Sequence, residues 1–204
     1  MIDGIKVKLQ IVSCLFFFFG LLTPAQEHSQ ALRLSEAEFI SLAGHCASAV
    51  PSDTLLAIAQ TESGLYTDAI SINRPRASAK RAGYADGHVI LSRQPRSRAE
   101  AKRWLRWLTL HHFTISVGLM QVNIETAQPL GISAEQLLEP CTNLRLGARI
   151  LAAAYSEVAR EIGEGFTALD AALSIYNTGD STAGFRNGYV ANVYAHAPYG
   201  SPQF

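Results

Sequence analysis

The chain has 204 residues, and its 17 lysines and arginines balance 17 aspartates and glutamates, so the formal net charge is zero. This balance gives no electrostatic reason to expect nucleic acid or an anionic membrane surface as a partner. The length is enough for one domain with its own hydrophobic core, and no second domain is required.

The first 25 residues have the pattern of an export signal. Lys6 and Lys8 precede a mostly apolar stretch over residues 9–22, and small residues follow at positions 23–25. A positive start, an apolar centre and a small-residue cleavage site are typical of secretory signals. We therefore predict that residues 1–25 are a signal peptide.

The mature chain then covers residues 26–204, and we predict that it forms one domain without stable membrane insertion. Two alternatives stay open. An uncleaved anchor is possible, although the apolar run is shorter than the roughly 18 residues of a spanning helix. Residues 11–14 also match a lipoprotein cleavage box superficially, but the apolar stretch lies mainly after Cys14 instead of before it.

The mature chain is predicted to be mostly helical. Ser35 and Glu38 form a capping-box pattern, in which the two side chains bond reciprocally to the first backbone amides of a helix. This helix should run toward Ala43, with Gly44 as its stop.

The next helix, over residues 51–64, carries an acid on its apolar face. Positions i, i+3, i+4 and i+7 share one face of a helix, and here they are Leu55, Ile58, Ala59 and Glu62. Burial and the negative end of the helix dipole both raise the pKa of a carboxyl group there, so Glu62 could hold the proton that a general acid needs. The alternative is a partly exposed glutamate paired with an arginine or lysine.

Residues 66–95 change in character, because proline, glycine, arginine and serine are frequent. Two short runs, residues 69–72 and 88–91, have strand-like composition, and we expect them to pair as a small β-hairpin. Ser97 and Glu100 repeat the capping-box pattern and open a further helix.

Residues 116–123 are too short and apolar to assign by periodicity. We interpret them as a buried extended segment that leads into a turn or a helix start at Asn123. A further capping-box pattern over residues 133–136 predicts a short helix that Pro140 stops.

Three more helices complete the chain. A long amphipathic helix should begin at residue 142 or 143 and end at Gly163. Thr167 and Asp170 should open the next helix, which ends near Gly179, and a final helix should cover residues 187–196.

Cys14 would leave with the signal, so Cys46 and Cys141 remain. In an oxidising compartment two remaining cysteines favour one disulfide. It would close a loop of about 95 residues and contribute about 3 to 5 kcal/mol; two buried free thiols are the alternative. No cysteine or histidine pair shows metal-ligand spacing, and His111 and His112 are only adjacent, so we predict no metal and no cofactor.

Three segments follow one another along the chain with a characteristic order and spacing: Glu62 with Ser63, G-L-M-Q over residues 118–121, and A-A-L-S-I-Y-N over residues 171–177. Together they resemble the lysozyme-like lytic transglycosylases that cut bacterial peptidoglycan. The resemblance implies a mainly α (α+β) fold, namely a lysozyme-like helical domain with a small β-hairpin.

Five stretches narrow the resemblance to the VirB1 branch: residues 45–46, 51–64, 116–123, 140–151 and 176–190. That branch opens the cell wall for type IV secretion and conjugation systems. It implies a periplasmic protein that acts on peptidoglycan glycan strands, with secretion or conjugation apparatus proteins as partners. The arginine- and proline-rich residues between 73 and 96 match nothing in the family, so their role stays undefined.

The resemblance implies that Glu62 is the catalytic residue, first as acid and then as base, in cutting the bond between N-acetylmuramic acid (MurNAc) and N-acetylglucosamine (GlcNAc). The product would carry a 1,6-anhydro end. Most glycosidases need a second carboxylate, and the matching motifs supply none. Asp68, Glu125 and Asp170 are nominal candidates, which we interpret as solvated residues and, for Asp170, as a helix cap.

The same resemblance implies substrate-binding roles for seven further residues. Ser63 should fix the end of the acid's helix, and Asn123 should cap the following turn. Met120 should form an apolar wall of the cleft, and the Gln121 amide should bind the sugar. The full set is Ser63, Ser71, Met120, Gln121, Asn123, Tyr176 and Asn177.

For four of these the simpler structural role stays open, and Asn177 could simply end its helix. Met120 could be ordinary core, and Ser63 a plain helix-end residue. Tyr176 should bond Glu62 or the substrate, unless its hydroxyl is satisfied inside the protein. At the level of function, a lysozyme-type glycoside hydrolase and a non-catalytic glycan-binding assembly protein remain as alternatives.

Overall fold

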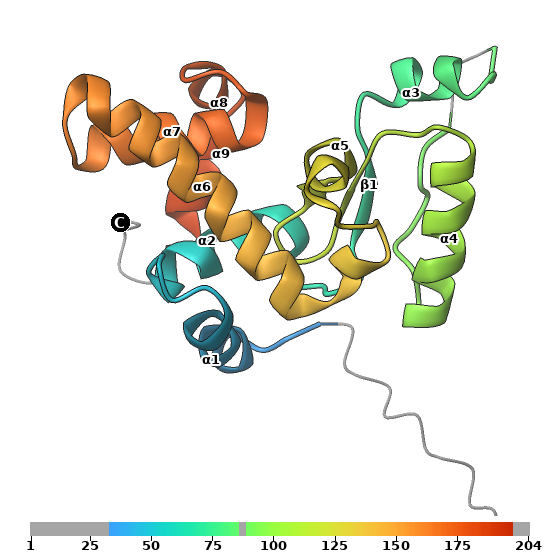
Figure 1. Ribbon diagram of the computed structural model, residues 1–204, viewed down its shortest axis with the longest axis horizontal. Helices are drawn as coiled ribbons and strands as arrows, with labels where there is room; N and C mark the ends of the chain where they lie inside the picture. Colours follow the sequence, from blue (N-terminus) through green and yellow to red (C-terminus); the bar gives the residue numbers. More distant parts are fainter. Residues whose placement is uncertain (1–32, 86–88, 198–204) are drawn as a thin grey trace, which may run out of the picture.

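The computed structural model describes residues 33–85 and 89–197, so the predicted signal peptide lies outside the described residues. The described chain is mainly helical with one small sheet (Figure 1). In chain order its elements are α1 (Glu36–Cys46), α2 (Ser52–Ser63), β1 (Ile70–Ile72), α3 (Pro75–Arg81), α4 (Arg98–Leu110), β2 (Ile115–Val117), β3 (Val122–Asn123), α5 (Ile124–Ala127), the 3-10 turns η1 (Gln128–Leu130) and η2 (Gln136–Leu138), α6 (Pro140–Ile162), α7 (Phe166–Thr178), α8 (Ala183–Arg186) and α9 (Tyr189–Ala195).

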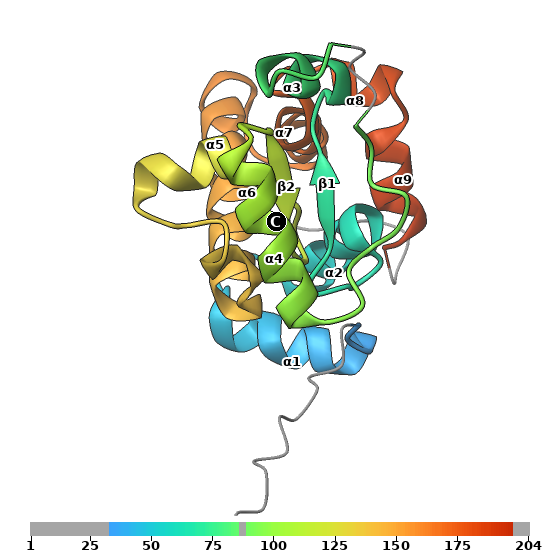
Figure 2. The ribbon, with the colours of Figure 1, turned by 90° about the vertical axis from the view of Figure 1, so that its right-hand side faces the viewer.

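The long helix α6 is the central element. It packs against α7 and α1, while α2 packs against α1 and α9. Helices α7, α8 and α9 lie on one side of the molecule, and the sheet with α3 and α4 lies on the other (Figures 1 and 2). This arrangement confirms the predicted mainly α fold with a small antiparallel sheet.

The capping box predicted at the start of α1 is present. In α1 the Ser35 hydroxyl accepts from the Glu38 amide at 3.3 Å, and the Glu38 carboxylate accepts from the Ser35 amide at 2.8 Å. The predicted stop at Gly44 is wrong, because α1 continues to Cys46. Gly44 has no positive φ, so nothing in its backbone ends the helix there.

The sheet differs from the predicted hairpin. β1 pairs with β2 in antiparallel register, with Ser71 opposite Ser116, and β2 pairs with β3. Residues 89–91 form no strand. The Gln94 side chain instead occupies the other edge of β1, since it accepts from the Ile70 amide at 2.8 Å and donates to the Ile70 carbonyl at 3.0 Å. The predicted pairing was wrong because one side-chain amide satisfies the edge that a second strand would have covered.

Helix α6 begins at Pro140, two residues before the earliest predicted start. The predicted short helix is η2, which ends at Leu138 before Pro140, and Pro140 is also the first residue of α6. A proline is well tolerated there because the amide it lacks would have no partner inside the helix. The helix ends at Ile162, directly before Gly163, as predicted.

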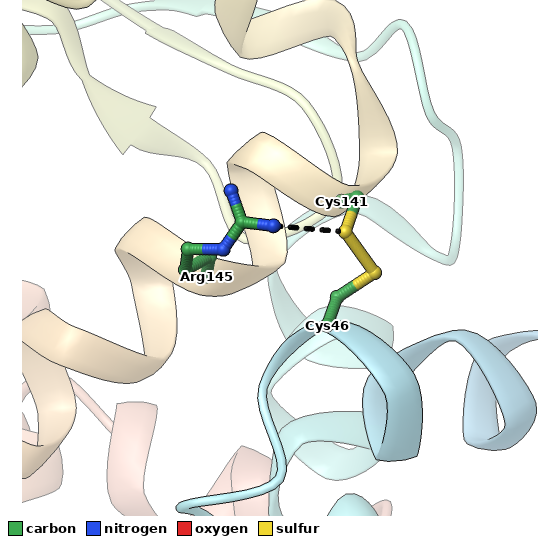
Figure 3. Close-up of a disulfide and its surroundings, with 3 residues drawn as sticks. All are labelled: Cys46, Cys141 and Arg145. Carbon is green, nitrogen blue, oxygen red and sulfur yellow. Dashed lines mark hydrogen bonds between the residues drawn. A yellow bond between two sulfur atoms is a disulfide. The ribbon is translucent and has the colours of Figure 1, made fainter.

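The predicted disulfide forms between the last residue of α1 and the first turn of α6 (Figure 3). Cys46 and Cys141 have Cα atoms 5.3 Å apart and are separated by 95 residues in the chain. Arg145, one helical turn further along α6, donates to the Cys141 sulfur at 3.4 Å. The bond ties α1, which packs on the acid-bearing α2, to the central helix.

None of the helices in the described part of the chain is both long and apolar enough to cross a membrane. Among the same residues, no group of three or more histidine, cysteine, aspartate or glutamate side chains could hold a metal ion.

Candidate active site

A cleft of about 640 Å³ lies between the sheet and the end of α7. Its walls come from the end of α2, from β1 and the segment after it, from the stretch between β2 and α5, and from α6 and α7. Its lining residues are Glu62, Ser71, Asn73, Arg74, Ser116, Gln121, Val122, Asn123, Thr126, Ile150, Ile175, Tyr176, Asn177, Thr178 and Gly179. Five of the sequence-predicted site residues besides Glu62 therefore line one cleft, namely Ser71, Gln121, Asn123, Tyr176 and Asn177.

Glu62 is in the last turn of α2, which ends when Gly64 adopts the left-handed conformation at φ 58°. Burial raises the pKa of Glu62 from its ordinary value of 4.5 to about 7, while a hydrogen bond from Tyr189 acts in the opposite direction. The sequence-based expectation of a raised pKa is confirmed. The carboxyl group is therefore shared between its protonated and ionised forms near neutral pH.

Tyr189 is the site residue that sequence reasoning missed. Its hydroxyl donates to Oε1 of Glu62 at 2.7 Å, and burial raises the pKa of Tyr189 well above its ordinary value, so it remains a donor. The signal was present, because Tyr189 falls in the stretch of residues 176–190 that carries the resemblance. No local pattern, however, shows that α9 packs against α2.

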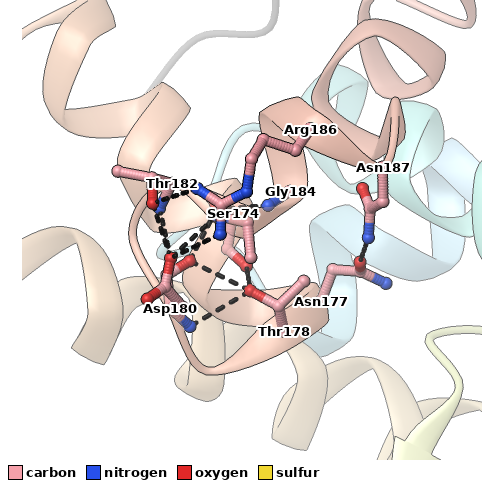
Figure 4. Close-up of polar contacts among 9 residues, drawn as sticks. Ser174, Asn177, Thr178, Asp180, Thr182, Gly184, Arg186 and Asn187 are labelled. Carbon is pink, nitrogen blue, oxygen red and sulfur yellow. Dashed lines mark hydrogen bonds and ion pairs between the residues drawn. The ribbon is translucent and has the colours of Figure 1, made fainter.

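The loop before Tyr189 is fixed by its own polar side chains (Figure 4). One oxygen of Asp180 accepts from the amides of Thr182 and Ala183, both at 2.8 Å. The Ser174 hydroxyl donates to the Asp180 carbonyl at 2.6 Å and accepts from the Gly184 amide at 2.8 Å. A Cβ on Gly184 would lie 2.7 Å from the Ser174 Cα, so only glycine allows this approach.

Asn187 links this loop to the end of α7. Its side-chain amide donates to Oδ1 of Asn177 at 2.8 Å, and its Oδ1 accepts from the Tyr189 amide at 2.9 Å. Asn177 thus lines the cleft and also anchors the segment that carries the partner of Glu62. Its amide nitrogen remains available to the cleft.

The turn over residues 118–121 is held by a buried asparagine of α6. Asn143 is fully buried, accepts from the Met120 amide at 2.7 Å, and donates to the Val117 and Leu137 carbonyls at 2.7 and 2.9 Å. Gly118 at φ 81° passes so close that a Cβ would lie 2.4 Å from the Asn143 amide nitrogen. Sequence reasoning gave Asn143 no part in the site, yet it shapes one wall.

Met120 does not line the cleft, so its predicted role as an apolar wall was wrong. Its side chain is fully buried, and a Cβ on Gly147 of α6 would lie 2.6 Å from the Met120 Cβ. The reason is that the turn points this residue into the core beside a glycine that leaves room for it. Only the Met120 carbonyl matters for the site, because it accepts from the Tyr176 hydroxyl at 2.7 Å.

Tyr176 lines the cleft, but its hydroxyl donates to Met120 instead of to Glu62. Burial and the neighbouring Glu62 charge raise the pKa of Tyr176 well above its ordinary value. Tyr176 therefore ties α7 to the turn and leaves the hydrogen bond to Glu62 to Tyr189.

Gln121 and Ser71 form a second tie across the cleft wall. The Ser71 hydroxyl donates to Gln121 Oε1 at 2.8 Å, and Gln121 Nε2 donates to the carbonyls of Gly118 and Ala69 at 2.9 and 3.2 Å. Both amide protons of Gln121 are thus used within the protein. Its oxygen keeps one free acceptor position.

Ser63 and Asn123 act as the sequence suggests at the level of local structure. The Ser63 hydroxyl contacts the Ala59 carbonyl at 3.0 Å and the Leu119 carbonyl at 2.8 Å, which joins the end of α2 to the turn. Asn123 caps α5 by accepting from the Glu125 amide at 2.8 Å and also lines the cleft. Ser63 is not among the lining residues.

Comparison with known proteins decides the family. Residues 40–195 match the family model described as "Transglycosylase SLT domain", which is most of the chain. The chain belongs to the transglycosylase SLT domain family. The matched segment includes Glu62, Gln121, Tyr176 and Tyr189.

This SLT domain is similar over most of its length to proteins named VirB1. It is 35% identical to protein VirB1 of Agrobacterium fabrum over 173 residues, which cover 85% of this chain and 64% of the relative. It is 33% identical to the type IV secretion system protein VirB1 of Brucella abortus over 165 residues, which cover 78% of this chain and 63% of the relative. These matches confirm the VirB1-like resemblance, although the chain spans less than two thirds of these relatives. No solved structure matches.

In this SLT domain the three nominal second carboxylates are engaged elsewhere. Asp68 is buried and pairs with Arg98 at 2.6 Å, so the expectation that it is solvated was wrong. Glu125 accepts from Thr114 at 2.9 Å and pairs with Arg81 at 3.5 Å. None of the three lines the cleft.

Asp170 was expected to cap α7, but the helix begins at Phe166 with Gly165 before it. Asp170 is therefore inside the helix, where its carboxylate accepts from the Tyr194 hydroxyl of α9. Among the described residues, Glu62 is the one carboxyl group that lines the cleft of this SLT domain.

Proposed function

We propose that the protein is a peptidoglycan lytic transglycosylase that cuts the MurNAc-β-1,4-GlcNAc bond and leaves a 1,6-anhydroMurNAc end. One observation carries the proposal: within residues 33–85 and 89–197 a single carboxyl group, that of Glu62, lines the cleft, and burial raises its pKa to about 7. A group with that pKa can donate a proton and then take one back at neutral pH.

The reaction begins when protonated Glu62 gives its proton to the glycosidic oxygen, which leaves as the 4-hydroxyl of GlcNAc while the bond to MurNAc C1 breaks. The Glu62 carboxylate then accepts the proton of the MurNAc C6 hydroxyl, whose oxygen attacks C1 and closes the 1,6-anhydro ring. Glu62 ends protonated, and no water is added. One residue thus serves as acid and as base in turn.

Tyr189 suits both stages. Its hydroxyl donates to Glu62 at 2.7 Å, and this hydrogen bond becomes charge-assisted when Glu62 is ionised. It therefore stabilises the carboxylate that forms in the first step, while burial keeps the proton on Glu62 before that step.

A lysozyme-type hydrolase is the second candidate, since it would use the same acid. Retaining and inverting glycosidases both place a second carboxyl group across the scissile bond. In the described part of the chain, Asp68, Glu125 and Asp170 are held by Arg98, Thr114 and Tyr194. The single acid therefore favours attack by the internal hydroxyl over attack by an activated water.

The cellular role follows from the named relatives. The relatives from Brucella are named type IV secretion system protein VirB1. By this similarity we propose that residues 1–25 direct export and that the domain acts in the periplasm on peptidoglycan glycan strands. There it would open the wall locally for a secretion or conjugation apparatus.

Digestion of purified peptidoglycan tests the activity. The wild-type chain should release muropeptides with anhydro ends, and Glu62→Gln should lower the rate at least about 100-fold, the lower range for general acid-base catalysis. Glu161→Gln, an exposed change on α6, is the matched control and should keep the wild-type rate. A fully active Glu62→Gln variant would refute the assignment, and strand binding by wild type without any product would favour a non-catalytic glycan-binding protein.

A further inference from the structure

Among the residues that the structure describes, Arg74 is the one cation in the lining of the cleft. Apart from Glu62, every other lining residue in the described chain is uncharged at neutral pH. Other arginines nearby are paired, for example Arg81 with Glu125 and Arg98 with Asp68. No described residue forms an ion pair or a side-chain hydrogen bond with Arg74, and its side chain is exposed. Its charge is therefore free to meet a ligand.

The backbone of Arg74 is strained in a way that sets its position. Its φ of 47° and ψ of 62° are left-handed, as is Gln121 at φ 43°, and both residues line the cleft. A non-glycine residue in this conformation costs about 1 to 3 kcal/mol and persists only where its surroundings hold it. Such strain is concentrated at binding and active sites.

The surroundings hold Arg74 from both sides. Before it, the Asn73 amide donates to the Thr114 carbonyl at 2.8 Å, and the Asn73 side chain donates to the Ser116 hydroxyl at 2.9 Å. After it, the Ser78 amide donates to the Arg74 carbonyl at 3.0 Å. The backbone of Arg74 is thus fixed beside the sheet, on the side of the cleft opposite α7.

We propose that Arg74 forms a carboxylate-binding subsite, through which the cleft selects glycan strands whose muramic acid substituents carry carboxylates. This proposal rests on the proposed function and deepens it. A guanidinium group offers paired donors that match the two oxygens of a carboxylate. The carboxylate comes from the stem peptide in intact strands and from the lactyl group in strands whose peptides have been removed.

A binding comparison in the Glu62→Gln background, which leaves the substrate uncut, tests the subsite. The three ligands are soluble strands with stem peptides, strands treated with an amidase to expose the lactyl carboxylates, and the neutral hexamer of N-acetylglucosamine. The added changes are Arg74→Gln and, as matched control, Arg76→Gln, an exposed arginine of α3 outside the cleft lining.

Arg74→Gln should weaken binding of a carboxylate-bearing strand about tenfold, as expected for the loss of a charge-assisted hydrogen bond. Binding of the neutral hexamer should stay within about twofold, and the salt dependence of strand binding should diminish. An effect confined to intact strands identifies the stem peptide, and one confined to treated strands identifies the lactyl group. Arg76→Gln should change none of these affinities.

Equal weakening for charged and neutral ligands, no weakening at all, or the same loss in Arg76→Gln would overturn the subsite. Cleavage by the wild-type chain is measured on the same strands, which separates the two proposals. Cleavage with an unaffected Arg74→Gln contradicts the subsite alone, whereas charge-selective binding without cleavage contradicts the activity alone. If the Glu62→Gln chain binds no strand, the subsite proposal fails, and wild-type cleavage alone decides the activity.

Discussion

Replacing Glu62 by glutamine should stabilise the folded protein increasingly as the pH rises from 4 to 8. Burial raises the pKa of Glu62 from 4.5 to about 7 in the folded state. Below pH 4.5 the carboxyl group is protonated whether the chain is folded or not, so it adds no pH dependence. Between pH 4.5 and 7 the unfolded chain loses this proton while the folded chain keeps it, so wild-type stability falls.

The size of the effect follows from the two pKa values. The difference between 4.5 and about 7 corresponds to about 3 kcal/mol, fully developed above pH 7. This is an upper figure, because Glu62 is partly exposed to the cleft and solvent screens its charge. Glutamine has a similar shape, carries no charge, and can still accept from Tyr189. The free energy of unfolding of Glu62→Gln minus that of wild type should therefore grow by up to about 3 kcal/mol between pH 4 and pH 8.

Urea unfolding followed by circular dichroism, with the disulfide intact, measures this difference at each pH. Glu161→Gln, on an exposed part of α6, controls for the loss of a surface charge. Its stability should follow the wild-type curve in parallel. If the Glu62→Gln and wild-type curves also run in parallel, the carboxyl group has no raised pKa and the general-acid argument is refuted.

Three further outcomes follow from the site. Tyr189→Phe removes the hydrogen bond that lowers the pKa of Glu62, so the alkaline limb of the pH-rate profile should move to higher pH. If this limb does not move, the hydrogen bond from Tyr189 does not influence the pKa of Glu62. Asn143→Ala leaves the buried partners of three hydrogen bonds unsatisfied and should lower the free energy of unfolding, measured in urea, by at least about 3 kcal/mol. A loss below about 1 kcal/mol would contradict the role of Asn143 in holding the turn. Joint replacement of Cys46 and Cys141 by serine opens a 95-residue loop and should lower the free energy of unfolding by about 3 to 5 kcal/mol in the same assay. An unchanged free energy of unfolding would show that the disulfide does not stabilise the fold.

The parts that sequence alone predicted depend on local signals. The capping box at Ser35, the stop at Gly64 and the cap at Asn123 each involve residues within four positions of one another, and each is confirmed. The raised pKa of Glu62 was also predictable, because its place on an apolar helix face already implies burial. Such signals identify the acid and the ends of its helix.

The parts that were missed depend on distant partners. β1 pairs with a strand more than forty positions later, and its other edge is filled by the side chain of Gln94. Asn143 is just another polar residue of α6 until the turn over residues 118–121 packs against it. Asp170 and Tyr189 likewise acquire their roles from α9 and α2, which no periodicity joins. Sequence reasoning thus found most of the cleft lining but missed Asn143 and Tyr189, whose contacts come from distant elements.

Cleavage of peptidoglycan in ¹⁸O-labelled water, with mass spectrometry of the muropeptides, tests the central claim most directly. If Glu62 alone acts as acid and then as base, the new ends are 1,6-anhydroMurNAc, lighter by one water than reducing ends, and they carry no label. New reducing ends that each contain one labelled oxygen would show that water is the nucleophile and would contradict the account.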